Sequence, residues 1–292
     1  MILTIASGKG GTGKTTIAVN LALSLASQQR SPTLLFLDCD VEEPNAHLFL
    51  NPVITAREDS ALMMPQVDDA VCAHHGRCSQ VCQFHAIAAL PNTTMVFPEL
   101  CHGCGGCTLE CPEQAISEVP HVIGVIEEGH AGSISFAHGI LNIGEPMATP
   151  IIRQLKRRIG SDYDLSILDA SPGTACPVVE SMRGADFVLL VTEPTPFGLH
   201  DLRLAVQVGR DELGLPVGVV VNQDGVGDKG VDEYCASEGI PILMRIPLDR
   251  RIAEAYSRGI PMVEALPEYR DQFRQLFARI GQEAESSNNS LS

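Results

Sequence analysis

Residues 7–16 read SGKGGTGKTT, and they come directly after the apolar run ILTIA at residues 2–6. The segment fits the pattern G-x4-G-K-[ST], which requires a strand before it and a helix after it. Residues 17–27 read as a helix, so both conditions are met. Glycines let the backbone wrap a phosphate group, and successive N–H groups at a helix N-terminus supply positive potential. The sequence therefore predicts a nucleotide-binding P-loop.

The predicted loop gives separate tasks to its residues. We expect Lys14 to contact the β- and γ-phosphates and Thr15 to bind Mg²⁺. The residues expected to form the phosphate cradle are Gly8, Gly10, Gly11, Thr12, Gly13, Lys14, Thr15 and Thr16.

Short apolar runs continue the alternation of strands and helices along the chain. Further strands are expected at residues 33–38, 122–126, 165–169, 186–192 and 217–222, with a helix at residues 151–159. Alternation of this kind predicts an α/β fold with a doubly wound, mostly parallel sheet and right-handed crossovers. The predicted P-loop NTPase domain is discontinuous and occupies residues 1–64 and 120–284.

The alternation breaks between residues 65 and 119, where seven of the ten cysteines lie. We expect residues 65–119 to form a small α+β domain inserted into the host fold. The polar segment at residues 285–292 is expected to be a disordered tail.

The composition indicates which kinds of partner and which cellular compartment to expect. A formal net charge of −16 disfavours binding to the nucleic-acid backbone and to anionic membranes. No apolar run approaches the roughly 20 residues that span a bilayer, and the first residues lack the layout of a signal peptide. We therefore expect a cytoplasmic protein that binds no nucleic acid and has no stable membrane anchor. Cytoplasmic thiols stay reduced, so the cysteines indicate metal ligation rather than disulfides.

The strongest cysteine pattern is CHGCGGCTLECP at residues 101–112, which has the C-x2-C-x2-C-x3-C-P spacing of bacterial ferredoxins. An earlier stretch, CAHHGRCSQVC at residues 72–82, falls on the same pattern when it is shifted by 29 positions, from 72 to 101. This internal repeat predicts a bacterial-type ferredoxin domain with two clusters, in which the fourth cysteine of each run binds the other cluster. Zinc is the alternative for residues 101–112, but zinc sites seldom use four cysteines at this spacing.

The repeat assigns the ligands of both clusters. Cluster II, a 4Fe–4S cluster, is expected on Cys82, Cys101, Cys104 and Cys107, and cluster I on Cys72, Cys78 and Cys111 with His75 in the fourth place. Three outcomes are open at His75: it binds the fourth iron of a 4Fe–4S cluster, the fourth iron is absent and the cluster is 3Fe–4S, or the Cys₃His set holds Zn²⁺. The sequence favours an iron–sulfur cluster over zinc, with His75 as a ligand ahead of a three-iron cluster. Adjacent His74 is expected to be a bystander.

A second lysine, Lys9, turns the loop into KGGTGKT at residues 9–15, which resembles the deviant Walker A motif of the MinD/ParA/Mrp superfamily of ATPases. On the residues alone, Lys9 is equally well a solvated loop charge. The resemblance implies that Lys9 reaches the partner's phosphates across an ATP-bound homodimer.

Other segments extend this resemblance over nearly the whole chain outside the insert. LDCDVEEPN at residues 37–45 resembles the switch I segment, which implies that Asp40 orients the attacking water and that Asp38 lies near Mg²⁺. SILDASPGT at residues 166–174 resembles Walker B and switch II, with Asp169 holding Mg²⁺ through water. The resemblance also implies that Asn222 reads adenine and that the RIPLD loop, with Pro247, lies against the base; on the residues alone, Asn222 is equally a strand-end cap.

Together, the two parts resemble the MinD-superfamily P-loop ATPases that contain an inserted ferredoxin domain. This resemblance implies a slow, partner-stimulated ATPase, with catalytic roles for Lys9, Lys14 and Asp40. We expect a dimeric switch that binds ATP and Mg²⁺ and couples nucleotide state to electron transfer or to an unknown redox or assembly partner. The alternatives are an ATP-dependent iron–sulfur scaffold or carrier, and a MinD-like positioning factor in cell division. Mrp-type carriers use a C-x-x-C pair in the C-terminal half, and this chain has only the isolated Cys39, Cys176 and Cys235 outside the insert.

Overall fold

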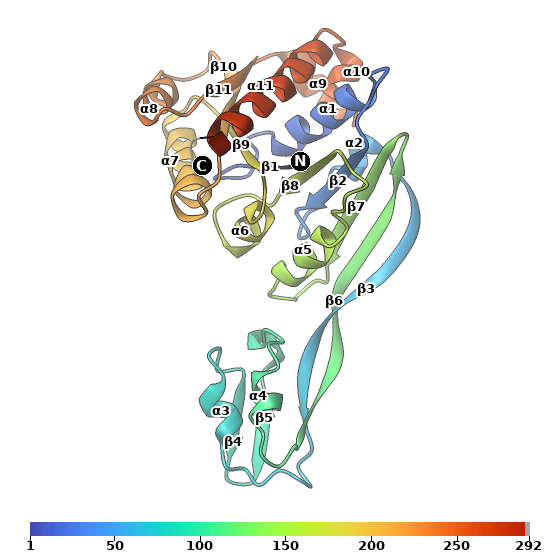
Figure 1. The fold of residues 1–292 in the computed structure, drawn as a ribbon, viewed down its shortest axis with the longest axis vertical. Helices are drawn as coiled ribbons and strands as arrows, with labels where there is room; N and C mark the ends of the chain where they lie inside the picture. The colour runs from blue at the N-terminus through green and yellow to red at the C-terminus, as the bar shows by residue number, and fades with distance from the viewer. Residues whose placement is uncertain (290–292) are drawn as a thin grey trace.

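Figure 1 shows the computed structural model, which describes the backbone of residues 1–289 and the side chains of residues 1–287. An α/β core lies at one end, and a small cysteine-containing unit lies at the other end of a long, twisted two-stranded ribbon. The strands are β1 (Ile2–Ala6), β2 (Leu34–Cys39), β3 (Val53–Val67), β4 (Ile87–Leu90), β5 (Thr93–Val96), β6 (Ile116–Ala131), β7 (Ile134–Leu141), β8 (Leu165–Ala170), β9 (Phe187–Thr192), β10 (Val217–Asp224) and β11 (Ile242–Pro247). The helices are α1 (Lys14–Ala26), α2 (His47–Leu50), α3 (Arg77–Val81), η1 (Pro98–Leu100), α4 (Gly106–Leu109), α5 (Thr149–Lys156), α6 (Cys176–Met182), α7 (Pro196–Val206), η2 (Gln207–Glu212), α8 (Gly230–Glu238), α9 (Arg250–Ser257), α10 (Met262–Ala265) and α11 (Tyr269–Asn289).

The main sheet has the strand order β11-β10-β9-β1-β8-β2-β7-β6-β3. Every pair from β11 to β7 is parallel, whereas β7–β6 and β6–β3 are antiparallel. The central strands are buried along their whole length, as expected for parallel strands covered on both faces. The prediction of a mostly parallel α/β sheet is confirmed.

Helices cover both faces of this sheet (Figure 1). Alternate residues of one strand enter different cores, as in β9, where Phe187 and Leu189 pack with α1 and α11 while Val188 and Leu190 pack with α6, α7 and α8. This alternation follows from the two-residue period of a strand. The P-loop therefore lies between two packed layers, at the carboxyl end of β1, where open α/β sheets bind ligands.

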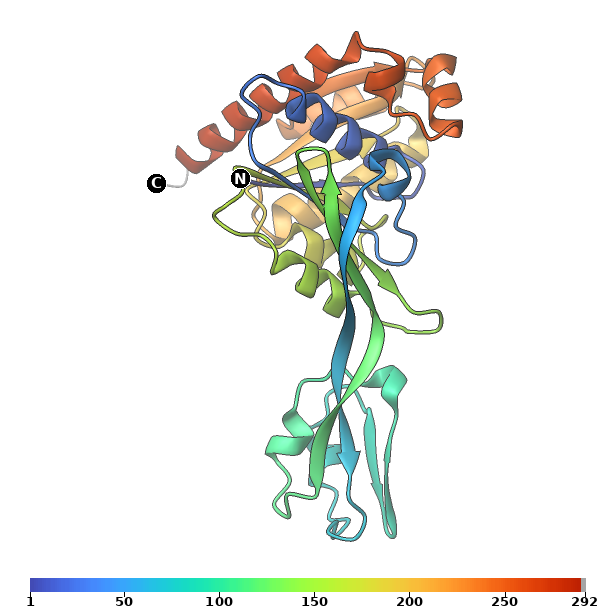
Figure 2. The ribbon, with the colours of Figure 1, turned by 90° about the vertical axis from the view of Figure 1, so that its right-hand side faces the viewer.

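The ribbon is formed by β3 and β6, which pair from Val53 opposite His130 to Val67 opposite Ile116. Near the core, β6 also pairs with β7, and this pairing ends at Gly124 opposite Leu141. Beyond that point the two strands continue alone and carry residues 68–115 away from the core (Figures 1 and 2). The expected boundaries at residues 65 and 119 thus fall inside strands, because pairing between such distant segments leaves no local sequence signal.

The C-terminal segment differs from the expectation. Helix α11 runs to Asn289, so the prediction of a disordered tail is wrong for residues 285–289; residues 290–292 lie outside the described residues. Within residues 1–289 we find no helix with the length and hydrophobicity of a membrane-spanning segment.

Candidate functional site

The P-loop turns sharply between β1 and α1. Gly13 has a φ of 95°, in the left-handed region, and a Cβ atom there would lie 2.6 Å from the side-chain nitrogen of Asn222. Only glycine fits both conditions. The carbonyl of Gly13 accepts the first helical bond from the N–H of Ile17, so α1 starts at Lys14 with its N-terminus at the loop.

A cavity of about 490 Å³ lies over this loop, which is within the size range of small-molecule sites. The predicted loop residues that line it are Gly10, Gly11, Gly13, Lys14, Thr15 and Thr16. Asp40, Asn222 and Pro247 also line it, from β2, β10 and β11 respectively or the loops after them. The structure thus brings together segments that are far apart in the sequence.

The other five predicted residues do not line this cavity. Gly8 packs against the backbone of α7, where an added Cβ would lie 2.1 Å from the carbonyl oxygen of Asp201. Thr12 is buried, and its carbonyl accepts a hydrogen bond from the Asn222 side chain at 2.9 Å. The side-chain amide of Asn222 therefore connects β10 to the P-loop, and Asn222 also lines the cavity. Lys9, Asp38 and Asp169 lie around the cavity and are described next.

Lys9 forms an ion pair within its own chain. Its Nζ atom lies 3.0 Å from Oε2 of Glu193, just after β9, and the other oxygen of Glu193 accepts a hydrogen bond from Gln223 at 2.9 Å. The Glu193 side chain is only 14% exposed. Sequence reasoning missed Glu193 and Gln223, although both follow or end strands whose carboxyl ends meet at this edge of the sheet.

Asp38 organises the loop between β2 and α2. One carboxylate oxygen accepts hydrogen bonds from the N–H groups of Asn45 and Ala46, each at 3.0 Å, and the other accepts from Asp40 at 3.1 Å. Burial and the neighbouring Asp169 carboxyl raise the pKa of Asp38 well above its usual range. Burial also raises the pKa of Asp40 to about 6, although the Lys14 ammonium opposes this.

Asp169, in β8, has two buried carboxylate oxygens without a hydrogen-bond partner among the described residues. Burial raises its pKa to about 7, against the effect of the nearby Thr15 hydroxyl and Lys14 ammonium. Burial lowers the pKa of Lys14, which the surrounding aspartates partly offset. A buried carboxylate without a partner is costly unless a cation or a proton compensates it. Oxygen donors of this kind suit Mg²⁺, so Thr15 and Asp169 fit the predicted ion.

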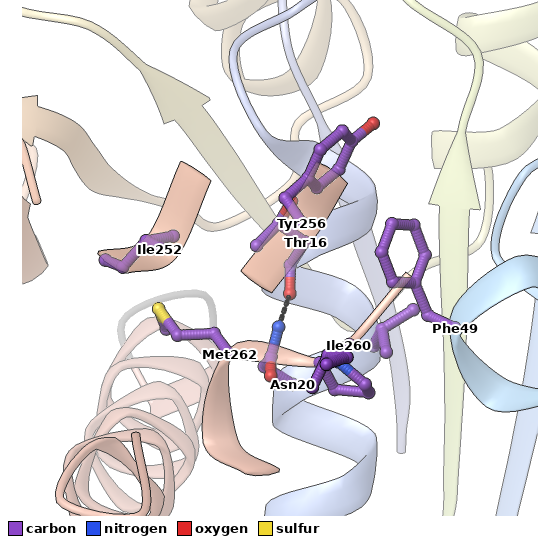
Figure 3. Close-up of a pocket in the computed structure, with 9 residues that line it drawn as sticks. Thr16, Asn20, Phe49, Ile252, Tyr256, Ile260 and Met262 are labelled. Carbon is purple, nitrogen blue, oxygen red and sulfur yellow. Dashed lines mark hydrogen bonds between the residues drawn. The ribbon is translucent and has the colours of Figure 1, made fainter. Parts of the chain in front are cut away.

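A smaller pocket adjoins the nucleotide cavity and shares Thr16, Ile252, Tyr256 and Met262 with it. Figure 3 shows these residues with Asn20, whose side-chain amide donates to the carbonyl of Thr16 at 2.7 Å. The Phe49 ring, from α2, lies on the other side of this pocket, 5.1 Å from the Tyr256 ring between centroids. Tyr256 therefore connects the cavity with α2, which leads directly into β3.

A second set of contacts lies at the base of the ribbon. His138, in β7, is 3% exposed, and its Nε2 atom lies 2.9 Å from Oε2 of Glu127 in β6. Its ring also lies edge-on to His47, the first residue of α2, at 5.2 Å between centroids. Arg57 of β3 bonds to the same Glu127 carboxylate at 2.8 Å. These contacts join both ribbon strands to the end of the loop that Asp38 holds.

The cysteine-containing unit repeats its backbone at the 29-residue spacing of the sequence. Left-handed residues recur at 74 and 103, at 76 and 105, and at 85 and 114. Helix α3 starts at residue 77 and α4 at residue 106. In each half an alanine N–H donates to a cysteine sulfur four residues earlier, Ala86 to Cys82 at 3.2 Å and Ala115 to Cys111 at 3.3 Å.

The predicted cluster ligands fall into two groups. One pocket in the unit is lined by all four residues expected for cluster II, Cys82, Cys101, Cys104 and Cys107. The three cysteines expected for cluster I, Cys72, Cys78 and Cys111, do not line this pocket and share an apolar cluster of side chains that also includes Cys82 and Cys107. Burial raises the pKa of the Cys78, Cys101 and Cys107 thiols, so these are protonated without a metal and must lose protons to bind one.

Within residues 1–289, no three His, Cys, Asp or Glu side chains converge as they would around a single metal ion. A single zinc ion needs its ligands within about 2.0–2.3 Å of one point. The thiolates of an iron–sulfur cluster bind different iron atoms and lie further apart, and four cysteines around one pocket have the donor chemistry of such a cluster. Outside the unit, Cys39 and Cys235 are buried and Cys176 is exposed.

Known proteins resemble this chain in both sequence and structure. Residues 3–262 match the family described as the CobQ/CobB/MinD/ParA nucleotide binding domain. An uncharacterized protein of Methanocaldococcus jannaschii is 30% identical, over 89% of this chain and 90% of that protein. An iron–sulfur cluster carrier protein of Pyrococcus horikoshii is 27% identical, over 89% of this chain and 78% of the relative. The solved structure of the septum site-determining protein MinD from the same organism, with Mg-ADP, has a TM-score of 0.60 at 20% identity and covers 98% of both chains.

The family match covers most of the chain, and the similarity to MinD shows the same fold. The predicted resemblance to the MinD/ParA ATPases is confirmed. The chain belongs to the CobQ/CobB/MinD/ParA family of P-loop nucleotide-binding proteins.

Proposed function

We propose that this protein is an ATP-driven dimeric switch that carries iron–sulfur clusters at the end of its ribbon and couples nucleotide state to electron transfer or to a redox partner. The observation that carries the proposal is the continuity between two sites. The loop that follows Asp38 enters α2, and α2 leads into β3, which reaches the cysteine-containing unit. A change at the nucleotide cavity therefore has a direct covalent and packed route to the cysteines.

In this proposal, the protein promotes ATP hydrolysis by positioning the phosphates and the attacking water and by neutralising the negative charge of the phosphates. Lys14 and the loop N–H groups bind the phosphates, while Thr15 and Asp169 hold Mg²⁺, which neutralises charge on the phosphates. Asp40 lines the cavity and orients the attacking water. Asn222 and Pro247 contact the adenine base of ATP. Lys9 leaves Glu193 and contacts the phosphates of a second chain, so hydrolysis is slow until a dimer forms and a partner stimulates it.

The insert in this proposal is a two-cluster ferredoxin domain. The backbone repeat at 29 residues and the pocket lined by Cys82, Cys101, Cys104 and Cys107 support a 4Fe–4S cluster there. Such a cluster supplies one-electron redox chemistry. The protein's own contribution is the burial of Cys101 and the N–H donors to the sulfurs of Cys82 and Cys101, whereas Cys104 is exposed. Solvent exposure and hydrogen bonds to the sulfurs both tune reduction potential.

Coupling follows two sets of contacts into the ribbon. A nucleotide in the cavity would lie next to Tyr256, which lines the cavity and contacts Phe49 of α2. The Asp38 loop ends at His47, which contacts His138 and, through it, Glu127. Because packed elements shift between discrete arrangements, a small movement of α2 changes how the ribbon leaves the core.

An ATP-dependent iron–sulfur carrier is the second candidate, because relatives covering most of this chain are named iron–sulfur cluster carrier proteins. The two candidates differ in the fate of the clusters. Resident clusters stay bound through redox cycling, whereas cargo clusters move to an acceptor. A positioning role in cell division is supported only by structures less than 25% identical, which establish the fold alone.

The test is a potentiometric titration of anaerobically purified protein, with and without a non-hydrolysable ATP analogue. The proposal predicts a shift in midpoint potential of about 40 mV or more, because a coupling free energy of about 1 kcal/mol corresponds to that shift for one electron. Incubation with an apo-acceptor protein and ATP forms the second arm. Unchanged potentials together with ATP-dependent transfer of iron to the acceptor would replace the switch with the carrier.

A further inference from the structure

The two halves of the cysteine-containing unit share a backbone but differ at one predicted ligand position. Cys104 lines the pocket of the second half, and His75 occupies the equivalent position in the first half. The side chain that contacts His75 is Glu113, whose equivalent in the repeat is Phe84. Phe84 stacks on His102 over the second-half pocket, with 3.6 Å between ring centroids. The two equivalent residues thus differ in their contacts: Glu113 forms a hydrogen bond with His75, whereas Phe84 stacks on His102.

Both ring nitrogens of His75 are bound to other groups of the protein. Nε2 forms a hydrogen bond with the Glu113 carboxylate, and Nδ1 accepts from the backbone N–H of Arg77 at 3.1 Å. The Arg77 side chain in turn forms an ion pair with Glu110 at 2.7 Å. The first loop is therefore held to the end of α4 and the residues after it by two carboxylates. An imidazole with both nitrogens engaged has no lone pair left for iron.

His74 is the other imidazole in this loop, and it is also engaged. Its Nδ1 atom lies 3.2 Å from the Thr94 hydroxyl, which is also 3.5 Å from the sulfur of Cys72. The remaining donors in the first half are the thiols of Cys72, Cys78 and Cys111, of which the last two are buried. These three thiols share an apolar cluster with Cys82 and Cys107, which line the second-half pocket. Cys72, Cys78 and Cys111 do not line that pocket, and with both histidines turned to other partners they form a three-ligand site.

We propose that the first-half site holds a 3Fe–4S cluster on Cys72, Cys78 and Cys111, and that Glu113 and the Arg77 backbone keep His75 away from the fourth corner. This inference rests on the proposed function, because it requires that the insert binds iron–sulfur clusters. Glu113 is a positioning residue, which acts by fixing the His75 ring. The second half, with Cys104 at the equivalent position, holds a complete 4Fe–4S cluster.

Electron paramagnetic resonance (EPR) separates the alternatives, because an oxidised 3Fe–4S cluster is paramagnetic and an oxidised 4Fe–4S cluster of this type is not. The full chain is purified anaerobically, oxidised mildly, and analysed for iron, zinc and spin. We expect about seven iron atoms and about one spin per chain, from one three-iron and one four-iron cluster. His75→Ala and His74→Ala should leave both values unchanged. His75→Cys, which recreates the second-half ligand set, should remove the signal and raise iron to about eight atoms.

The matched control is Cys104→Ala, which removes the fourth ligand from the second half and should bring the spin count to about two per chain. If that variant loses its second cluster, the comparison of wild type with His75→Cys still distinguishes a 3Fe–4S from a 4Fe–4S cluster in the first half. An EPR-silent oxidised wild type with about eight iron atoms would overturn the inference while leaving the iron–sulfur module intact. So would loss of signal in His75→Ala, or zinc at about one atom per chain without a signal. A protein without iron in every variant would instead sink the proposed function itself.

Discussion

The Nζ atom of Lys9 lies 3.0 Å from the carboxylate of Glu193 in the same chain. The lysine that our proposal assigns to a partner's phosphates is thus bound to its own subunit, in a pair that Gln223 also supports. Breaking the ion pair between Lys9 and Glu193 costs free energy. The interaction of Lys9 with the phosphates of a second subunit must offset that cost. In our proposal, Glu193 therefore opposes dimer formation until nucleotide is present.

Lys9→Ala should abolish the dimer formed with an ATP analogue, because the variant lacks the ammonium group that our proposal places on the partner's phosphates. Glu193→Gln should release Lys9 and lower the analogue concentration needed for dimer formation about fivefold, since such partly exposed ion pairs contribute about 1 kcal/mol. Sedimentation velocity measures both effects. Lys229→Ala, an exposed lysine elsewhere, is the control. Equal dimer formation by Lys9→Ala and wild type would contradict the role given to Lys9.

Asp169→Asn should stabilise the nucleotide-free protein above neutral pH. The raised pKa of Asp169, about 7, means that the folded state keeps this proton more tightly than the unfolded state. Its contribution to stability is therefore present at low pH and is lost as pH rises from about 4 to about 7. At pH 8 the neutral amide avoids a charge penalty of up to about 4 kcal/mol. Urea unfolding at pH 6 and pH 8 measures the gain, which should be larger at pH 8, and Mg-ATP should stabilise the variant less than wild type. Destabilisation of the nucleotide-free variant at pH 8 would refute this account of Asp169.

ATP hydrolysis should fall as pH is lowered through about 6. The Asp40 carboxyl has its pKa raised to about 6 by burial, and its carboxylate form is the stronger hydrogen-bond acceptor for the attacking water. The profile of kcat/KM reports groups of the free enzyme, so this limb should appear there. Asp40→Asn should lower the rate and remove the limb. Glu43→Gln, at a neighbouring carboxyl that also lines the cavity, is the control and should keep the limb but move it to lower pH, because the Glu43 charge raises the pKa of Asp40. If Asp40→Asn keeps the wild-type profile, another group positions the water.

His138→Gln should uncouple the ribbon from the nucleotide site without weakening nucleotide binding. The variant removes the link between His47 and Glu127, whereas the cavity residues are untouched. Hydrogen exchange of residues 53–67 and 116–131, with and without an ATP analogue, measures the coupling. Wild type should show a nucleotide-dependent change that the variant lacks. His121→Gln is a matched control, because His121 lies in β6, the strand next to β7, and likewise pairs with a carboxylate, Glu145 at 2.8 Å. An unaltered response in His138→Gln would show that the signal takes another route.

The sequence predicted those parts of the molecule whose causes are local. The strand before Gly8, the helix after Gly13 and the 29-residue repeat of the cysteines all appear as local patterns, and the structure has the corresponding elements and the backbone repeat. The ribbon could not be predicted, because β3 contains the polar run Arg57, Glu58 and Asp59 and pairs with residues that lie between 49 (Val67 with Ile116) and 77 (Val53 with His130) positions away. The same holds for the partners of predicted residues. Glu193 lies 184 positions from Lys9, and Glu113 lies 38 positions from His75.

The most direct measurement is the iron and acid-labile sulfide content of an anaerobic preparation whose ATP hydrolysis is assayed on the same sample. The account predicts a brown protein that hydrolyses ATP and holds about seven iron atoms per chain. Replacement of Cys101 and Cys107 by alanine should remove about four of them and leave ATP binding intact. A colourless wild-type protein that hydrolyses ATP without bound iron would contradict the account.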